Sequence, residues 1–532
     1  MPVTYSKTLF LLNIYSYSAS SKRTHKKRAL SEIKKLASQT IWYGVPTIAS
    51  RFLGYLMNLS LPLFFAQPSV TADLTQIYAM IPFLNVLFTY GLETAYFRFS
   101  KEEDPQKLYS TLSLSLIGST ILFTGIILLF SNQIIGWSNL ESHPEYIYWM
   151  IAIIFFDAIS TLAFARLRQE NKPRKYAVVR LSSVLVNFLS VLFFLGIIPK
   201  YVTNHPASDL SFFTNNGIGI GYYLLGNLAG SILTFILLFK EFKQISFQFN
   251  PAIWKKVLNY SYPLIIVGMG GMVNDMLSRL IYQHVVDLPV EEAKHELGIF
   301  GNIYRLAVLI TILIQAFRMA AEPFFFKQSA EEHAQKIYAR VMKFFVITCC
   351  YMFLFISLFI EIFAWFFNAI NKPLWTEGLY IVPLLALGNI FLGIYYNLSI
   401  WYKLTDKNRM GAYITIAGAL ITIGLNIVLI PTLHYLGAAI ATFTCYFFMM
   451  TISYWMGQKF YPVPYATKKI IAYLVIICLL YAIHKLILFF IPQLWVGIVT
   501  GLVFIGLFSW LILWAEKKEF QRIPFLNKII SK

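Results

Sequence analysis

Long apolar segments recur along almost the whole chain, and this feature constrains the fold more than any other. A helix needs about 20 apolar residues to cross a bilayer core, and fourteen segments of the 532-residue chain reach that length. They cover 39–66, 74–97, 109–131, 145–165, 177–198, 217–239, 258–284, 297–320, 344–368, 377–402, 411–431, 434–456, 468–490 and 493–514. Because lipid offers no hydrogen-bond partner to an open backbone, we expect an all-α, polytopic membrane protein.

The composition excludes several soluble classes. Hydrophobic residues make up 58% of the chain and charged residues only 13%, whereas soluble proteins carry about 25% charged residues. A soluble enzyme, a nucleic-acid-binding protein and a disordered chain are therefore excluded. All the cysteines lie inside apolar segments, so neither a disulfide framework nor a metal site is expected. They are Cys349, Cys350, Cys445 and Cys478.

The positive charge follows a topological pattern. If the N-terminus is cytoplasmic, the loops and tails on that side hold 36 of the 44 Lys and Arg residues, and the opposite loops hold four. This asymmetry is the positive-inside rule, so the net charge of +19 needs no nucleic-acid partner. It predicts cytoplasmic N- and C-termini, a disordered basic extension over 1–37 and a basic tail over 515–532.

Two stretches of the chain resemble each other and suggest a duplication. Glu93–Asp104 ends the second segment and Glu322–His333 ends the eighth, with matching Glu, Phe, Ser and Glu-Glu positions. The match predicts two parallel six-helix bundles, over 38–243 and 250–458, followed by two additional helices over 466–514. Parallel repeats of this kind enclose a cavity in transporters that alternate between two open states.

Charged residues inside the segments are costly, at about 2.5–3.5 kcal/mol each near the bilayer centre. Arg51 and Asp157 are predicted to lie deepest, and Arg305 lies about two turns into its segment. Asp275 and Arg279 are four residues apart, so they share a helix face and can pair. Two interpretations remain open: the arginines hold an anionic head group in a polar cavity, or the charges form ion pairs that fasten helices together.

The remaining buried charges suggest coupling and gating roles. Asp157 and Asp275 are the carboxylates that could bind a proton or sodium ion within the membrane. Glu93, Glu322, Arg180 and Arg318 lie nearer the cytoplasmic ends, where a gating or structural role is expected and the arginines can reach the head groups. The sequence carries no nucleotide-binding P-loop, metal-ligand spacing or nucleophile motif. We therefore expect no cofactor and no enzyme activity, with coupling to an ion gradient or the membrane potential.

Several motifs resemble those of a known family. They are Gly91–Arg98, Ala165–Arg174, Tyr260–Leu264, Asp275 with Arg279, Leu297–Arg305 and Gln315–Phe326. From about residue 35 onward, the chain resembles the bacterial polysaccharide (O-antigen type) flippases of the multidrug/oligosaccharidyl-lipid/polysaccharide exporter superfamily, which are related to the lipid II flippases.

The resemblance implies twelve core helices in two bundles, with two more helices as in the lipid II flippases. It implies that an undecaprenyl-diphosphate-linked oligosaccharide is flipped from the cytoplasmic to the periplasmic leaflet by alternating access, for polysaccharides such as the O-antigen of lipopolysaccharide. In that family a cationic central cavity receives the diphosphate-sugar head, and Arg51, Arg279 and Arg305 are the corresponding candidates. We expect a monomer in the bacterial inner membrane, in contact with membrane lipids and polysaccharide-assembly proteins.

Two other functions remain as alternatives. A multidrug/cation antiporter of the same superfamily needs an acidic, aromatic cavity for organic cations. A membrane glycan polymerase or ligase generally carries a large periplasmic catalytic loop, and the longest outer loop here, 199–216, is too short to form such a domain.

Overall fold

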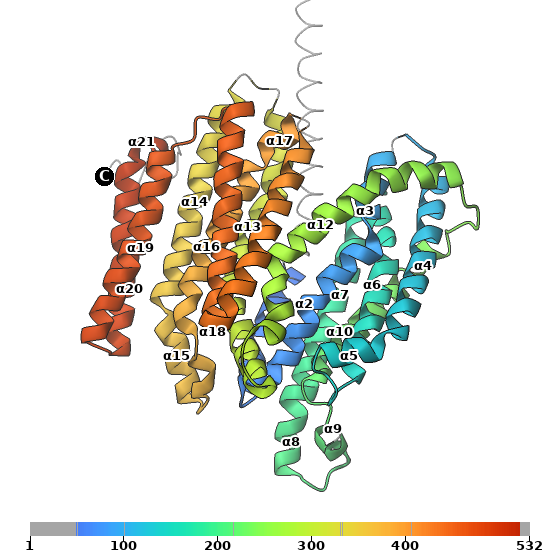
Figure 1. The fold of residues 1–532 in the computed structure, drawn as a ribbon, viewed down its shortest axis with the longest axis horizontal. Helices are drawn as coiled ribbons and strands as arrows, with labels where there is room; N and C mark the ends of the chain where they lie inside the picture. Colours follow the sequence, from blue (N-terminus) through green and yellow to red (C-terminus); the bar gives the residue numbers. More distant parts are fainter. Residues whose placement is uncertain are drawn as a thin grey trace, which may run out of the picture.

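The computed structural model describes residues 49–521 apart from 51, 101, 216, 330, 332 and 406, without side chains at 320, 322, 323, 326, 327 and 520. Over these residues the chain is all-α, as predicted (Figure 1). Eleven described helices are long and apolar enough to cross a membrane. The predicted extension 1–37, Arg51 and most of the predicted tail 515–532 lie outside the described residues.

The first bundle contains the first six predicted segments (Figure 1). Its elements are helix Phe52–Phe64, η1 (Pro68–Thr71), α2 (Ala72–Thr89), α3 (Leu92–Phe99), α4 (Pro105–Leu129), α5 (Ser131–Trp137), α6 (Glu145–Gln169), α7 (Pro173–Val191), η2 (Leu192–Ile197), α8 (Ile198–Asn204), η3 (Asp209–Ser211), α9 (Phe212–Asn215), α10 (Gly221–Leu237) and α11 (Phe239–Phe242). The second predicted segment is interrupted between α2 and α3, where Tyr90 and Gly91 have φ of 32° and 74°. Such left-handed backbone favours glycine.

Helix α12 (Pro251–Val285) contacts both bundles. Its first turns place Ile253 and Val257 in one hydrophobic core with Tyr96 and Leu108 of the first bundle. Its later part packs against the second bundle, where Asn274 belongs to the helix surface that faces α18 (Asn408–Phe460). The predicted boundary at 250 therefore assigns to one bundle a helix that links the two. The boundaries 38–243, 250–458 and 466–514 stay predictions.

The second bundle is built around α13 to α18. After α12 these elements are α13 (Val290–Gln328), α14 (Ala334–Leu358), α15 (Ile360–Ala369), η4 (Pro373–Thr376), η5 (Leu379–Ile381), α16 (Val382–Leu398), α17 (Ile400–Leu404) and α18. One large hydrophobic core joins them and extends to the C-terminal helices through Tyr473 and Phe508.

Helix α18 is a hairpin of two spans rather than one rod. Its backbone turns at His434, with φ 53° and ψ −136°. Beyond the turn, Cys445 lies against the carbonyl oxygen of Gly418 at 3.5 Å, and a Cβ at Gly437 would lie 2.3 Å from the carbonyl oxygen of Leu429. These pairings run antiparallel, so the chain reverses between the predicted segments 411–431 and 434–456.

The C-terminal pair, α19 (Thr467–Phe490) and α20 (Leu494–Ala515), packs beside α14 (Figure 1), followed by α21 (Lys517–Phe520). Glu516, just after α20, is 2% exposed. It accepts hydrogen bonds from Lys343 of α14, from Lys469 at 2.8 Å and from Tyr473 at 2.6 Å. This buried carboxylate fastens the pair to the second bundle.

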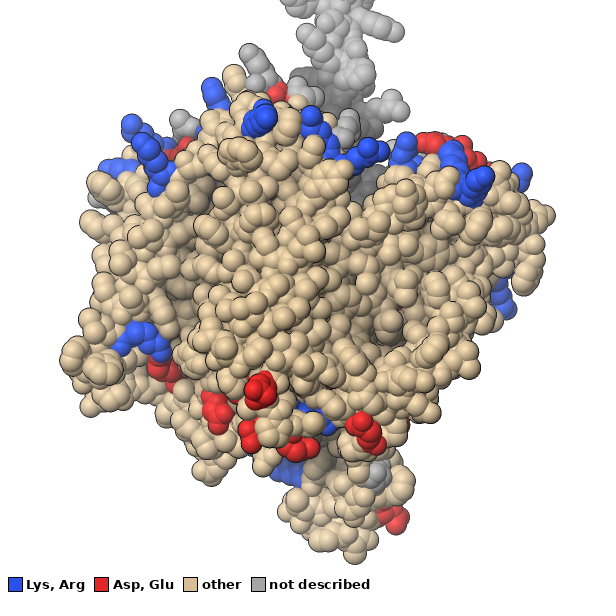
Figure 2. All heavy atoms as spheres, viewed as in Figure 1, with Lys and Arg blue, Asp and Glu red and all other residues tan. Residues whose placement is uncertain are grey.

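The charges divide between the two ends of the molecule. Lys and Arg gather at the end where α12 and α14 begin, called the basic end here, and Asp and Glu gather at the opposite, acidic end in this view (Figure 2). This arrangement agrees with the charge asymmetry of the sequence.

The two bundles are joined at the acidic end. Asp73 of α2 pairs with Lys294 of α13 at 3.4 Å. Trp375 Nε1 donates to the carbonyl oxygens of Phe65 and Ala66, each at 3.2 Å. These contacts close the acidic end between the bundles.

Close backbone approach accompanies these polar contacts. A Cβ at Gly298 would lie 2.1 Å from the carbonyl oxygen of Pro68, and one at Gly301 would lie 2.3 Å from Thr75 Oγ1. Glycine at both positions lets α13 lie directly against η1 and α2.

Candidate functional site

A cavity of about 410 Å³ lies between the two bundles. The first bundle contributes Tyr55, Asn58, Thr75 and Tyr78 to its lining, and the second contributes Arg279, Tyr304, Arg305 and Gln315. Its volume is within the range of small-molecule sites, about 300–1,000 Å³. The structure therefore brings two of the three predicted arginines together in one cavity.

Arg279 is held on one side of the cavity by groups of the second bundle. Its Nη2 donates to the backbone carbonyl oxygen of Asp275 at 2.5 Å and lies 3.5 Å from the Asp275 carboxylate. Its guanidinium carbon lies 3.9 Å from the ring centroid of Tyr304, whose hydroxyl donates to Asp275 Oδ1 at 2.6 Å. The predicted pairing of Asp275 with Arg279 is thus present, with Tyr304 as a third member, and two of the three residues, Arg279 and Tyr304, line the cavity.

Arg305 lines the same cavity without such partners. Its Nη1 is buried and has no hydrogen-bond partner among the described residues, and the same holds for Nε of Arg279. A buried donor without a partner carries its full desolvation cost. Two arginines, one of them without a carboxylate partner among the described residues, therefore line a space that an anion could occupy.

The first bundle lines the cavity with neutral groups. The Tyr78 hydroxyl accepts a hydrogen bond from Asn227 Nδ2 at 2.6 Å, and Asn58 Nδ2 donates to the carbonyl oxygen of Gly54 at 2.9 Å. None of the lining side chains that the structure describes in this bundle carries a charge. The positive charge of the described lining comes entirely from the second bundle.

Asp157 does not line this cavity. It lies on α6 inside the first bundle, where its Oδ1 accepts a hydrogen bond from Ser231 of α10 at 2.8 Å. The structure thus separates the two predicted ion-coupling carboxylates: Asp275 contacts two residues of the cavity lining, Arg279 and Tyr304, whereas Asp157 lies within the first bundle. The coupling role of both stays a prediction.

The three predicted gating residues whose side chains the structure describes do not line the cavity. Glu93 pairs with Arg168, Arg180 stacks on the ring of Phe164 at 4.4 Å, and Arg318 lies 4.7 Å from the ring centroid of Tyr396. The side chain of Glu322 and all of Arg51 lie outside the described residues. These contacts are the kind that fasten neighbouring helices.

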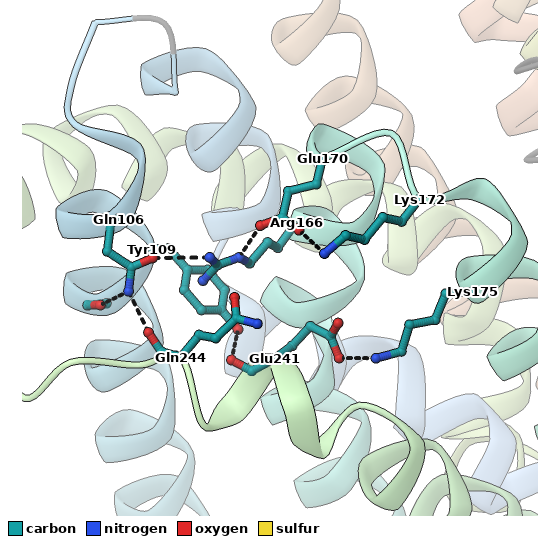
Figure 3. A network of polar contacts seen from close by, with 9 residues as sticks. Gln106, Tyr109, Arg166, Glu170, Lys172, Lys175, Glu241 and Gln244 are labelled. Atoms are coloured by element: carbon teal, nitrogen blue, oxygen red, sulfur yellow. Dashed lines mark hydrogen bonds and ion pairs between the residues drawn. The ribbon is translucent and has the colours of Figure 1, made fainter.

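At the basic end of the first bundle, cationic side chains are paired with carboxylates and other acceptors (Figure 3). Arg166 donates to Glu170 at 2.6 Å and to Gln106 at 3.1 Å, and it covers the ring of Tyr109 at 4.2 Å. Burial raises the pKa of the Glu170 carboxyl, but hydrogen bonds from Lys172 and Arg166 more than offset this effect and hold that pKa below its usual value. Arg305 differs because no carboxylate of the described residues pairs with it.

The sequence interpretation missed the neutral side of the cavity. Tyr55, Tyr78 and Gln315 are ordinary residues of apolar segments, whereas the candidates predicted from the sequence are all charged. Tyr304 could have been found, because it directly precedes Arg305 in the Leu297–Arg305 motif.

Solved structures share this fold. The lipid II flippase MurJ in an inward closed conformation superimposes with a TM-score of 0.65 at 16% identity, covering 89% of this chain and 99% of that one. An inward-facing multidrug resistance MATE family transporter of the MOP superfamily superimposes with a TM-score of 0.62 at 13% identity, covering 79% of this chain and 94% of that one. A third structure is a MOP superfamily transporter from Pyrococcus furiosus, whose binding pocket is described as having reverse polarity. It superimposes with a TM-score of 0.55 at 12% identity, covering 79% of this chain and 95% of that one.

No curated protein matches the chain. The polysaccharide biosynthesis protein family matches residues 64–329, which is half of the chain, and this membrane protein therefore belongs to that family.

Proposed function

We propose that this protein flips undecaprenyl-diphosphate-linked oligosaccharides from the cytoplasmic to the periplasmic leaflet of a bacterial inner membrane. The single observation that carries the proposal is the cavity between the bundles, whose described lining includes Arg279 and Arg305 and no carboxylate. A diphosphate brings negative charge into a medium of low dielectric, and its oxygens match the planar donors of guanidinium.

Alternating access suits this cargo. The isoprenoid tail stays in lipid, so only the charged head needs a polar path. The bundles are closed at the acidic end by contacts such as Asp73–Lys294. With the basic end cytoplasmic, as the positive-inside rule indicates, this closure is on the periplasmic side, and release of the head requires these contacts to break.

The energy source belongs to the same proposal. Asp275 accepts from Tyr304 and faces Arg279, so a proton or sodium ion on its carboxylate would change how strongly Arg279 is held. Coupling to an ion gradient or to the membrane potential would act through this pair. The substrate itself, membrane lipids and polysaccharide-assembly proteins are the proposed partners, with the protein acting as a monomer.

The experiment is deletion of the gene in its host, followed by mass analysis of lipid-linked oligosaccharides. We expect them to accumulate on the cytoplasmic leaflet and to return to normal when the intact gene is restored. The Arg305→Gln variant should fail to restore them at normal membrane abundance. Arg409→Gln, outside the cavity lining, is the control and should restore them.

Two outcomes would contradict the proposal. Unchanged lipid-linked oligosaccharides together with new sensitivity to cationic drugs would indicate a multidrug/cation antiporter. Accumulation of single repeat units already on the periplasmic leaflet would indicate a glycan polymerase or ligase.

A further inference from the structure

The charge of the central cavity is divided between its two walls. Arg279 and Arg305 both come from the second bundle, whereas the described lining of the first bundle carries tyrosine, asparagine and threonine side chains. A ligand in this cavity therefore meets cations on one wall and neutral hydrogen-bonding groups on the other. Such a division fits a head group with one charged part and one neutral part.

Two tyrosines of the neutral wall have hydrogen-bonding capacity to spare. The Tyr55 hydroxyl makes no hydrogen bond to any described residue, although Tyr55 lines the cavity. The Tyr78 hydroxyl accepts from Asn227 Nδ2 at 2.6 Å, so its own proton is left to donate. A hydroxyl is both a donor and an acceptor, and a tyrosine ring adds apolar surface beside it.

Neighbouring side chains fix this wall in place. Asn227 of α10 positions the hydroxyl of Tyr78, and the ring of Tyr78 packs edge-on against that of Tyr223 with centroids 5.6 Å apart. Asn58, also on this wall, is held by the hydrogen bond from its Nδ2 to the carbonyl oxygen of Gly54. The wall is thus pre-organised, which lowers the entropy that binding must overcome.

Gln315 extends the neutral lining onto the second bundle. It lies ten residues after Arg305 on α13, or about 15 Å along a helix, in the direction of the basic end. Its amide makes no hydrogen bond to the described residues. Neutral groups with unused donors and acceptors therefore lie both opposite the arginines and between them and the basic end.

From this division we infer that Tyr55, Tyr78 and Gln315 form a subsite for the neutral sugar attached to the diphosphate, while Arg279 and Arg305 bind the diphosphate. This inference rests on the proposed function. A pyranose presents hydroxyl groups at its rim and C–H groups on its faces, which match the hydroxyls and the rings of the two tyrosines. A cavity of about 410 Å³ admits only the part of the glycan next to the diphosphate.

The phosphate end of the head group is bound by the second bundle, whereas the sugar end also contacts Tyr55 and Tyr78 of the first bundle, so the ligand bridges the two bundles. A lipid diphosphate without sugar would occupy only the cationic wall and would not draw the bundles together.

Binding to the purified full-length protein in lipid nanodiscs tests this subsite. The two probes are undecaprenyl diphosphate and the same lipid carrying one neutral hexose. We expect the double variant Tyr55→Phe, Tyr78→Phe to lose about five- to tenfold in affinity for the hexose-bearing probe, because two neutral hydrogen bonds are removed. Its affinity for undecaprenyl diphosphate should not change. Tyr413→Phe, on an exposed part of α18, is the matched control and should change neither affinity.

The outcomes distinguish this inference from the proposed function. Equal losses for both probes, or no loss for either, would overturn the sugar subsite while leaving the diphosphate site intact. If Arg305→Gln binds both probes as well as the unmodified protein does, or if the unmodified protein binds neither, then the proposed function itself fails.

Discussion

Arg279 of α12 and Tyr304 of α13 lie face to face, with the guanidinium carbon 3.9 Å from the ring centroid. Asp275 joins them by accepting the Tyr304 hydroxyl at 2.6 Å. The ring and the carboxylate hold one cavity arginine in place, while Arg305, the next residue in sequence after Tyr304, has no such support. The two arginines are therefore expected to respond differently to substitution.

Arg305→Gln should abolish binding of undecaprenyl diphosphate without lowering thermal stability. A buried charge without a partner costs free energy, so its removal should leave the unfolding temperature unchanged or raised. Arg166→Gln is the control. It breaks the contacts with Glu170, Gln106 and Tyr109, so it should lower the free energy of unfolding by about 1.5–3 kcal/mol. Thermal unfolding in detergent measures the stability of both variants. An equal destabilisation by the two variants would show that Arg305 is a structural residue.

Asp275→Asn should tighten the binding of undecaprenyl diphosphate and remove the dependence of transport on an ion gradient. Without the carboxylate, Arg279 no longer shares its charge, and we expect roughly tenfold higher affinity, equivalent to about 1.4 kcal/mol. Flipping in proteoliposomes with and without a gradient provides the second measurement. Adding Arg279→Gln to this variant should cancel the gain in affinity; a gain that persists would mean that Arg279 is not responsible.

Glu516→Gln should loosen the C-terminal helices from the second bundle. The substitution leaves Lys343, which is 7% exposed, without its buried partner. Removing one partner of a buried ion pair lowers stability by about 3–5 kcal/mol. Glu519→Gln is the matched control, because Glu519 is more exposed and lies farther from its cationic partners, 3.3 Å from Arg340 and 3.9 Å from Lys343. We expect the control to lower stability by less than about 1 kcal/mol. Hydrogen exchange over α19 and α20 should be faster in Glu516→Gln than in Glu519→Gln.

The same carboxylate predicts a dependence on pH. Burial raises the pKa of Glu516, but hydrogen bonds from Lys343, Lys469 and Tyr473 more than offset this and hold that pKa below its usual value. A carboxyl whose pKa is lower when folded contributes stability above its unfolded pKa, about 4.3, and this stability is lost as the pH falls through the folded value. The attachment of α19 and α20 should therefore persist at neutral pH and weaken only below about pH 4. Weakening near pH 6 would contradict this assignment.

Gly298→Ala should disfavour closure at the acidic end. A Cβ there would lie 2.1 Å from the backbone oxygen of Pro68, a contact that needs α13 and η1 to move apart. We expect a several-fold lower yield when a short thiol reagent links cysteines placed at Asp73 and Lys294. Gly424→Ala is the control, because a Cβ at Gly424 meets nothing within 4 Å. Equal yields in the two variants would indicate that closure does not depend on this approach.

The positions of the spans could be predicted from the sequence alone. The lengths of the apolar segments and the positions of Lys and Arg can be read directly from the sequence. The thickness of a bilayer and the positive-inside rule relate them to the spans and their orientation. Each predicted segment has a helical counterpart in the described part of the chain, including the two that meet at His434. The Asp275–Arg279 pairing was accessible for a similar reason, because a spacing of four residues fixes a shared helix face.

Only the tertiary structure decided which deep charges meet. Arg305 and Asp157 both lie inside spans, yet one lines the cavity and the other bonds to Ser231 within its own bundle. Position in the sequence gives the depth of a residue, but the rotation of each helix about its axis depends on how its neighbours pack against it. That rotation brings Tyr55 and Tyr78 of one bundle opposite Arg279 and Arg305 of the other. These residues are far apart in the sequence, so no local pattern could predict that they line the same cavity.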